Sequence, residues 1–326
     1  VRVQPFTSIK YLDGIPVQIR QMYGDESLQD KKLQLTAVVK ISGKNIQYVH
    51  YGIEASFYAR MLPLINGLKA AHSNLHTRLP DGVYLFSLAD GEHYGVYPWP
   101  ILALASSKAL VNSGRVVLMP DVEALNGYRE LFKQINIGAH KYPWAKKTAK
   151  IFWRGQSTGA AVYTNDFDDF PRGRFLNYVH DLSYVDAAFV AYSPYLNQDF
   201  AQRLKQKFPL QPGIRRSEFM AYKYLIDIDG QSCSYERMAL AMYSNSLLLK
   251  HQTDKVQWYY DRLQPGQNFL PIAEDFSNLQ VQYQWAEEHP KEVRAMINKS
   301  RNLAIEVFSQ HGVRKATAAA LRRYQK

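Results

Sequence analysis

Residues 224–250 read YLIDIDGQSCSYERMALAMYSNSLLLK, and this stretch decides the fold class. An apolar run at 224–228 is followed by a loop with one glycine and two serines. A helical pattern over 235–244 comes next, and then a second apolar run at 246–250. A strand, a crossover helix and another strand imply a parallel sheet. The loop then lies at the carboxyl edge of the sheet, where open α/β folds bind their ligands.

The rest of the chain extends this alternation of short apolar runs and helical patterns. Further runs typical of buried strands cover 83–88, 115–119, 151–153 and 268–272. At 326 residues the chain exceeds one ordinary domain, so we expect an α/β protein of two lobes. A basic stretch at 141–150, with a proline and a tryptophan, is the expected linker. We predict an N-terminal lobe at 1–145, a second lobe at 146–310 and a basic C-terminal helix or tail at 311–326.

The composition is that of a globular protein. Hydrophobic residues make up 46% of the chain and charged residues 21%, which excludes a wholly disordered chain. The apolar stretches are too short to span a bilayer, and because the sequence starts without a charged and then apolar leader, we expect no signal peptide. The lone cysteine, Cys233, cannot form an internal disulfide, so we expect a cytoplasmic protein.

The chain is basic. Forty Lys and Arg against 29 Asp and Glu give a formal net charge of +11, which favours nucleotides, phosphorylated glycans, nucleic acid or an anionic membrane surface as partners. The basic residues are dispersed, and no nucleic-acid-binding module is recognisable, so we expect no nucleic acid partner. A solvated face is the alternative interpretation of any single basic cluster.

The first candidate site is the stretch FWRGQSTG at 152–159. It places Arg154, Gly155, Ser157 and Thr158 where an apolar strand ends. Small residues let backbone amides approach an oxyanion, and arginine binds phosphate through two hydrogen bonds. The spacing fits neither a Walker loop nor a dinucleotide fingerprint, and an ordinary turn is the alternative.

The second candidate site is Ser232, Ser234 and Arg237, where the helix after the 224–228 strand begins. Free amides and a partial positive charge at a helix N-terminus favour a diphosphate. The two hydroxyls and Arg237 would add to this attraction. The alternative is a helix capped by Ser234, with Arg237 in solvent.

The third candidate is Asp90, which follows the apolar run at 83–88. A carboxylate at the end of a strand can accept the proton of an attacking hydroxyl. Glu92 lies two residues further on and is the next candidate for this base. A turn that begins with Asp-Gly is the alternative.

Two patterns typical of metal sites are present, but we predict no metal. Asp227-Ile228-Asp229 has the Asp-x-Asp form of many metal-bound nucleotide-sugar sites. We expect its acids to point to opposite faces at the end of a strand, with Asp227 structural. His72 and His76 have the spacing of a zinc pair on a helix, but no third ligand is evident.

Together these segments resemble glycosyltransferase family 90, which groups capsule xylosyltransferases, Rumi-type protein O-glucosyltransferases and bacterial lipopolysaccharide sugar transferases. The resemblance covers about residues 80 to 310 and is strongest from 151 to 279. The matching pieces are 83–91, 143–147, 152–155, 172–176, 222–230, Ser234, Arg237, 245–247 and 271–279.

The resemblance implies a GT-B architecture, in which two Rossmann-like lobes enclose a cleft and the C-terminal lobe binds a UDP-sugar. Its donor residues then correspond to Arg154, Gly155, Ser157, Thr158, Ser234 and Arg237, and we expect Arg174 and Ser232 to complete the donor site. Asp90 falls where the family's proposed catalytic aspartate lies. The implied reaction is inverting and needs neither a metal nor another cofactor.

In the expected mechanism, Asp90 takes the proton of the acceptor hydroxyl while Arg237 and the helix N-terminus stabilise the departing UDP. We expect the acceptor to be a glycan or glycolipid of bacterial lipopolysaccharide or capsule synthesis. The excess positive charge would then attract the protein to the inner face of a membrane as a peripheral protein. The alternative function is a non-catalytic binder of anionic glycans or lipids.

Overall fold

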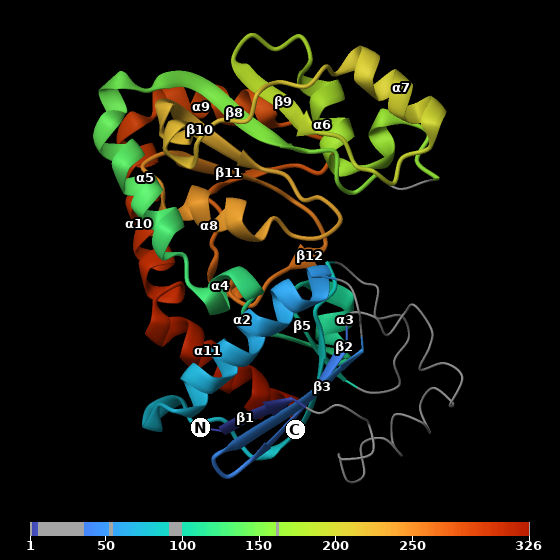
Figure 1. Ribbon diagram of the computed structural model, residues 1–326. Coiled ribbons are helices and arrows are strands. Elements are labelled where there is room, and N and C mark those ends of the chain that lie inside the picture. Colours follow the sequence, from blue (N-terminus) through green and yellow to red (C-terminus); the bar gives the residue numbers. More distant parts are fainter. Residues whose placement is uncertain (1, 6–35, 52–54, 91–99, 161–162, 326) are drawn as a thin grey trace. The chain divides into compact units, whose positions relative to one another are not determined.

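A computed structural model describes residues 2–5, 36–51, 55–90, 100–160 and 163–325 of the chain (Figure 1). Its contacts divide the chain into two compact units. Unit 1 comprises Val1–Gly127, Asp254–Tyr260 and Phe308–Lys326, and unit 2 comprises Tyr128–Thr253 and Asp261–Val307. The predicted α/β class is confirmed, because each unit has its own sheet and its own helices.

Unit 1 contains a six-stranded mixed sheet. The strand order is β1 (Arg2–Pro5), β3 (Asn45–Tyr51), β2 (Thr36–Ser42), β4 (Gly82–Ser87), β5 (Ile101–Ala103) and β7 (Val116–Leu118). Strands β4, β5 and β7 are parallel, so their carboxyl ends share one edge. A separate antiparallel pair joins β6 (Ser106–Ser107) to β12 (Lys255–Val256).

The helices of unit 1 are α2 (Ala55–His72), α3 (Lys108–Asn112), α4 (Val122–Asn126) and α11 (Gln310–Tyr324), with the short 3-10 helix η3 (Leu75–Thr77). Helix α2 contacts both α4 and α11. In the described part of the chain, no helix combines the length and the apolar character that crossing a bilayer requires.

Unit 2 contains a five-stranded sheet in which every neighbouring pair is parallel. The strand order is β13 (Leu270–Ile272), β11 (Leu247–His251), β10 (Tyr222–Asp227), β8 (Thr148–Gln156) and β9 (Val185–Ala191). The helices are α5 (Arg129–Lys141), α6 (Pro171–Val179), α7 (Gln198–Lys207), α8 (Tyr235–Tyr243), α9 (Leu279–Glu288) and α10 (Pro290–Val307). The short 3-10 helices are η4 (Trp144–Lys146), η5 (Phe167–Asp169) and η6 (Arg216–Ala221), and η7 (Tyr260–Arg262) begins at the last residue of a unit 1 segment and continues into unit 2.

The predicted strand, loop, helix and strand of 224–250 are β10, the loop after it, α8 and β11. The two strands pair in parallel, with Leu225 opposite Leu248. All five carboxyl ends of the unit 2 sheet therefore meet at one edge, as the sequence predicts for this crossover. The loops at this edge carry four of the eight predicted donor-site residues, Ser157, Thr158, Ser232 and Ser234.

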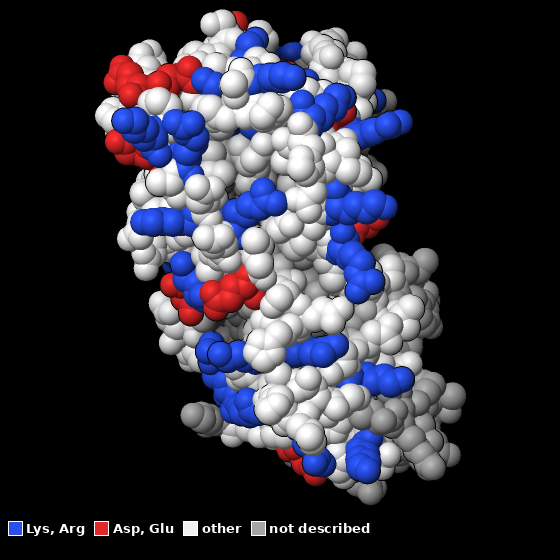
Figure 2. Space-filling view, turned by 90° about the vertical axis from the view of Figure 1, so that its left-hand side faces the viewer, with Lys and Arg blue, Asp and Glu red and all other residues white. Residues whose placement is uncertain are grey.

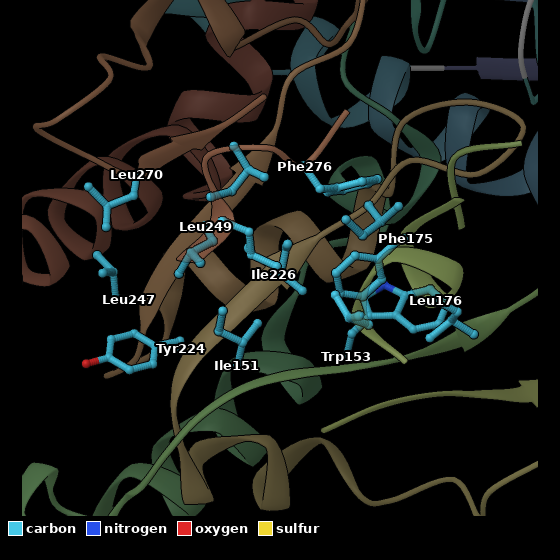
Figure 3. Packing of buried hydrophobic residues seen from close by; sticks show 14 of the residues in the cluster. Ile151, Trp153, Phe175, Leu176, Tyr224, Ile226, Leu247, Leu249, Leu270 and Phe276 are labelled. Atoms are coloured by element: carbon cyan, nitrogen blue, oxygen red, sulfur yellow. The ribbon is translucent and has the colours of Figure 1, made fainter. Parts of the chain in front are cut away.

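The core of unit 2 follows from the two-residue period of its strands. Ile151 and Trp153 point to the face that α6 covers, where Phe175 and Leu176 pack beside them (Figure 3). Trp153 is 1% exposed, and its ring lies 5.9 Å from that of Phe175. Burial of such a large apolar side chain contributes about 2–3 kcal/mol to stability. The strand that leads to the candidate loop is therefore firmly anchored.

The unit boundary differs from the sequence prediction. The predicted break at 145–146 lies inside unit 2, because the residues before it pack there. Lys141 bonds to Glu218 at 2.9 Å, and the Asn245 side chain donates to the Tyr142 carbonyl at 3.0 Å. The predicted tail at 311–326 is mostly helix α11 and belongs to unit 1.

A lysine is buried where β8 begins. Lys147 is 6% exposed, and its Nζ donates to the Met220 carbonyl and, at 2.9 Å, to Ser246 Oγ. Burial lowers the pKa of Lys147 to about 7. The folded protein therefore binds its proton more weakly than the unfolded chain does, and the cost of burying the charge is present in full below pH 7.

We expect wild-type stability to rise between pH 6 and pH 9 by a Lys147 contribution on the order of 2 kcal/mol. The sign follows because between pH 7 and the ordinary lysine pKa the unfolded chain binds more protons than the folded protein. Lys147→Met should remove this contribution, whereas Lys146→Met, at an exposed neighbour, should keep it. Urea unfolding at both pH values measures this, and an unchanged pH dependence in Lys147→Met would contradict it.

Candidate functional site

Two loops meet at the carboxyl edge of the unit 2 sheet, one after β8 and one after β10. Gly159 adopts a positive φ of 98°, and a Cβ there would lie 3.1 Å from the Gly230 carbonyl group. A Cβ on Gly230 would lie 2.5 Å from Thr158 Oγ1 and 2.9 Å from Arg172 Cζ. Glycine at both positions therefore lets the two loops approach each other closely.

Two arginines converge on these loops. Arg172, from α6, donates to the Gln156 carbonyl at 3.0 Å, to Thr158 Oγ1 and to the Ile228 carbonyl at 3.5 Å. Arg237, from the first turn of α8, donates to the same Ile228 carbonyl at 3.4 Å. Both guanidinium groups also lie against the Trp153 ring, at 5.8 Å for Arg172 and 5.2 Å for Arg237.

The position of Arg237 depends on Gly155. A Cβ at Gly155 would lie 2.8 Å from Arg237 Nη2 and 2.5 Å from the Trp153 ring. Any side chain at this position would collide with the tryptophan ring and displace the guanidinium group. Gly155 thus leaves the space that Arg237 occupies beside β8.

The positive charges at this edge exceed the negative ones. Within the described residues the cluster joins the cations Arg172, Arg237 and Lys250 to the acids Asp227 and Asp229. Burial first, and then the nearby charge of Arg237, lower the pKa of Arg172 to about 9. Burial also lowers the pKa of Arg237. Because burial disfavours both guanidinium charges, an anionic ligand beside them would stabilise them.

Asp227 is the last residue of β10, and Asp229 lies in the loop after it. Asp227 accepts from Ser234 Oγ and, at 3.4 Å, from Lys250 Nζ, and Asp229 accepts from Thr253 Oγ1 at 2.6 Å. Burial lowers the pKa of Lys250, but Asp229 and Asp227 more than offset this and raise it above the ordinary value. Burial raises the pKa of Asp229.

The expectation that the acids of Asp227-Ile228-Asp229 point to opposite faces is wrong. Residues two apart on a strand share a face, and both acids act on Lys250. Among the residues that the structure describes, no group of three or more His, Cys, Asp or Glu side chains has an arrangement suited to a metal ion.

The predicted serines and threonine have different roles. Ser234 occupies the N-cap position of α8, but its hydroxyl donates to Asp227 and makes no capping bond. Ser232 is 5% exposed, and its Oγ has no hydrogen-bond partner among the described residues. Ser157 Oγ accepts from the Ser193 amide at 2.8 Å and ties β8 to the segment after β9. Thr158 Oγ1 accepts from Arg172.

Arg154 and Arg174 lie outside this cluster. Arg154 points to the opposite face of β8, over the Phe152 ring at 4.7 Å, and pairs with Asp186 at 2.6 Å. Arg174 donates to the Asp168 carbonyl at 2.9 Å and is 35% exposed. Their donor-binding roles stay predictions, and the structure brings Arg172 to the loops instead.

Arg172 was missed as an individual site residue, although the sequence contains a signal for it. It shares a helical spacing with Phe175, Leu176 and Val179, and all four are buried. Arg174 is off this face. An arginine on the apolar face of a short helix is rarely buried without a structural or binding role.

In unit 1, Asp90 follows the carboxyl end of β4 with a side chain that is 45% exposed. Arg60, from α2, pairs with its Oδ2 at 2.6 Å. Glu123, which the sequence prediction missed, comes after the parallel strand β7. Burial, then Asp121 and also Asp90, raise the pKa of Glu123 to about 7. Glu92, the alternative base, lies outside the described residues.

A parallel sheet whose carboxyl edge presents two arginines, two close glycine loops and a helix N-terminus has the features of proteins that bind phosphorylated ligands. Comparison with known families agrees. Residues 117–326, more than half of the chain, match the family described as glycosyl transferase family 90. The chain belongs to this family, and the resemblance predicted from the sequence is confirmed.

Similar proteins include protein O-glucosyltransferase 2 of Danio rerio, 24% identical over 231 residues, which are 67% of this chain and 42% of that protein. Protein O-glucosyltransferase 3 of Homo sapiens is 23% identical over 72% of this chain and 44% of its own length. O-glucosyltransferase LpsA of Dichelobacter nodosus is 24% identical over 49% of this chain and 44% of its own. The chain thus spans less than half the length of these relatives.

Among solved structures, Anabaena HepE in complex with UDP-glucose is similar with a TM-score of 0.44 and 12% identity. The similarity covers 71% of this chain and 65% of that one.

Proposed function

We propose that this chain transfers a sugar from a UDP-sugar to a hydroxyl group of a glycan or glycolipid. The observation that carries the proposal is the pair Arg172 and Arg237, which converge on one carbonyl at the carboxyl edge of a parallel sheet. Membership of glycosyl transferase family 90 supports it. The names of the similar proteins make UDP-glucose the first donor to test.

In the proposed reaction the diphosphate of the donor lies against Arg172, Arg237 and the first turn of α8. As the bond to the anomeric carbon breaks, negative charge grows on the leaving diphosphate. Two guanidinium groups and a helix N-terminus free of a side-chain cap can stabilise this charge. The transfer is therefore proposed to be independent of metal.

Asp90 is proposed as the general base. Its carboxylate takes the proton of the acceptor hydroxyl while the oxygen attacks the anomeric carbon, on the side opposite the departing UDP. Such an attack inverts the configuration at that carbon. Arg60 forms an ion pair with Asp90 Oδ2 at 2.6 Å.

A bacterial lipopolysaccharide or capsule glycan is the proposed acceptor, and the similarity to LpsA of Dichelobacter nodosus favours it. The net charge of +11 would attract a phosphorylated glycolipid at the cytoplasmic face of a membrane. Lys and Arg are scattered among uncharged residues on the face in Figure 2, so we expect a diffuse attraction that high salt weakens.

The decisive experiment measures release of the nucleoside diphosphate, UDP from UDP-glucose, UDP-galactose and UDP-xylose and GDP from GDP-mannose, with alkyl glycosides as acceptors and with EDTA present. We expect one UDP-sugar to react, EDTA to have no effect, and the product to have the inverted anomeric configuration by NMR. Binding without UDP release from any donor would instead support the alternative of a non-catalytic binder. Loss of activity in EDTA would contradict metal independence.

A further inference from the structure

Arg60 forms two hydrogen bonds to the segment that carries Asp90. Arg60 Nη1 donates to the Leu88 carbonyl, and Nη2 donates to Asp90 Oδ2 at 2.6 Å. The nitrogens of a guanidinium group have fixed positions in one plane. The distance and the angle between the Leu88 carbonyl and the Asp90 carboxylate are therefore set by a single rigid group.

The packing around Asp90 does not hold its side chain by itself. Leu88 is fully buried and Ala89 is 5% exposed, so the chain is fixed up to this point. The Asp90 side chain then emerges and is 45% exposed. No other described residue donates a hydrogen bond to its Oδ1, so Arg60 orients the carboxylate and leaves the second oxygen open to a substrate hydroxyl.

Arg60 itself is firmly placed. Its helix, α2, packs against α4, where Gly67 lies under Leu125 so closely that a Cβ would be 2.5 Å from the leucine side chain. An arginine on such a helix loses little freedom when it holds a partner. The packed helices, through Arg60, therefore determine the position of the Asp90 carboxylate.

Arg60 also provides the positive charge in an acidic setting. Glu123, at the start of α4, lies close enough to Asp121 and to Asp90 for both carboxylates to raise its pKa. Repulsion among these acids would otherwise favour other orientations of the exposed Asp90 carboxylate. The ion pair offsets this repulsion at Oδ2.

We propose that Arg60 is the positioning residue of the general base: it fixes Asp90 so that Oδ1 faces the acceptor hydroxyl. The inference rests on the proposed function, in which Asp90 takes the proton. Misplacement of a reacting group by about 1 Å costs up to roughly 100-fold in rate. Arg60 should therefore act on kcat and leave donor binding unchanged.

The test is a double-mutant cycle on UDP release from UDP-glucose with water as acceptor. In the wild-type background, Arg60→Ala should lower kcat by roughly 30-fold and leave the KM for UDP-glucose within about twofold of the wild-type value. In the Asp90→Asn background, the same substitution should lower kcat by less than about twofold. Arg60→Lys keeps the charge without the second bond and should recover part of the rate. Lys69→Ala, at an exposed position of the same helix, is the matched control.

Added guanidinium chloride at low millimolar concentration should restore part of the kcat of Arg60→Ala, whereas sodium chloride should not. Equal losses for Arg60→Ala in both backgrounds, or a KM that rises in parallel, would overturn the proposal and leave Arg60 as a structural residue. If Asp90→Asn alone kept the full rate, the assignment of the base in the proposed function would fail instead. The two failures are therefore distinguishable.

Discussion

Asp90→Asn should lower the rate of UDP release from UDP-glucose by about 10³-fold, the range typical for loss of a general base. The amide has nearly the shape of the carboxylate and can still accept from Arg60 through its oxygen, but it cannot take a proton from the acceptor. Because Asp90 lies in unit 1 and the proposed donor residues lie in unit 2, calorimetry should find the affinity for UDP unchanged within about twofold.

Two further variants make this result specific. Glu123→Gln should cost less than about threefold, because no step of the proposed transfer uses the Glu123 carboxyl. Glu92→Gln tests the other candidate base. Full activity in Asp90→Asn together with loss of activity in Glu92→Gln would move the role of base to Glu92.

The second large effect concerns the donor. Arg172→Ala and Arg237→Ala should each weaken UDP binding by about 100-fold, because each removes a charge-assisted contact of about 1.5–3 kcal/mol to the diphosphate. Isothermal calorimetry measures the dissociation constant directly. Thermal unfolding of each variant shows whether the fold is kept, and Arg172→Lys and Arg237→Lys, which retain the charge, should bind UDP with intermediate affinity.

Arg174 and Arg154 serve as matched controls, because their side chains point away from the two loops. Arg174 is two residues from Arg172 on the same helix, and Arg154 precedes Gly155 on β8. On the contacts described above, Arg174→Ala and Arg154→Ala should leave UDP affinity within about threefold. If Arg154→Ala or Arg174→Ala weakened binding as much as Arg172→Ala, the donor site would follow the sequence prediction rather than the arginine pair at the loops.

The sequence by itself determined the class of fold and the edge of the sheet that carries the candidate site. The apolar runs at 224–228 and 246–250, with a helical pattern between them, allow one arrangement of neighbouring parallel strands. The positions of Ser234 and Arg237 at the start of α8 follow from the same local pattern. Such periodicities are properties of ten to thirty consecutive residues, so they need no knowledge of the remaining chain.

Only the tertiary structure decided which charged groups meet. Arg60 and Asp90 are 30 residues apart, and Arg172 reaches a carbonyl 56 residues away. The choice of Arg172 over Arg174, and of Arg237 over Arg154, depends on which face of a helix or strand turns toward the loops. The assignment of α11 to unit 1 likewise depends on packing against distant residues. Local periodicity gives two faces to every strand and helix, and long-range packing alone determines which of them is buried against the site.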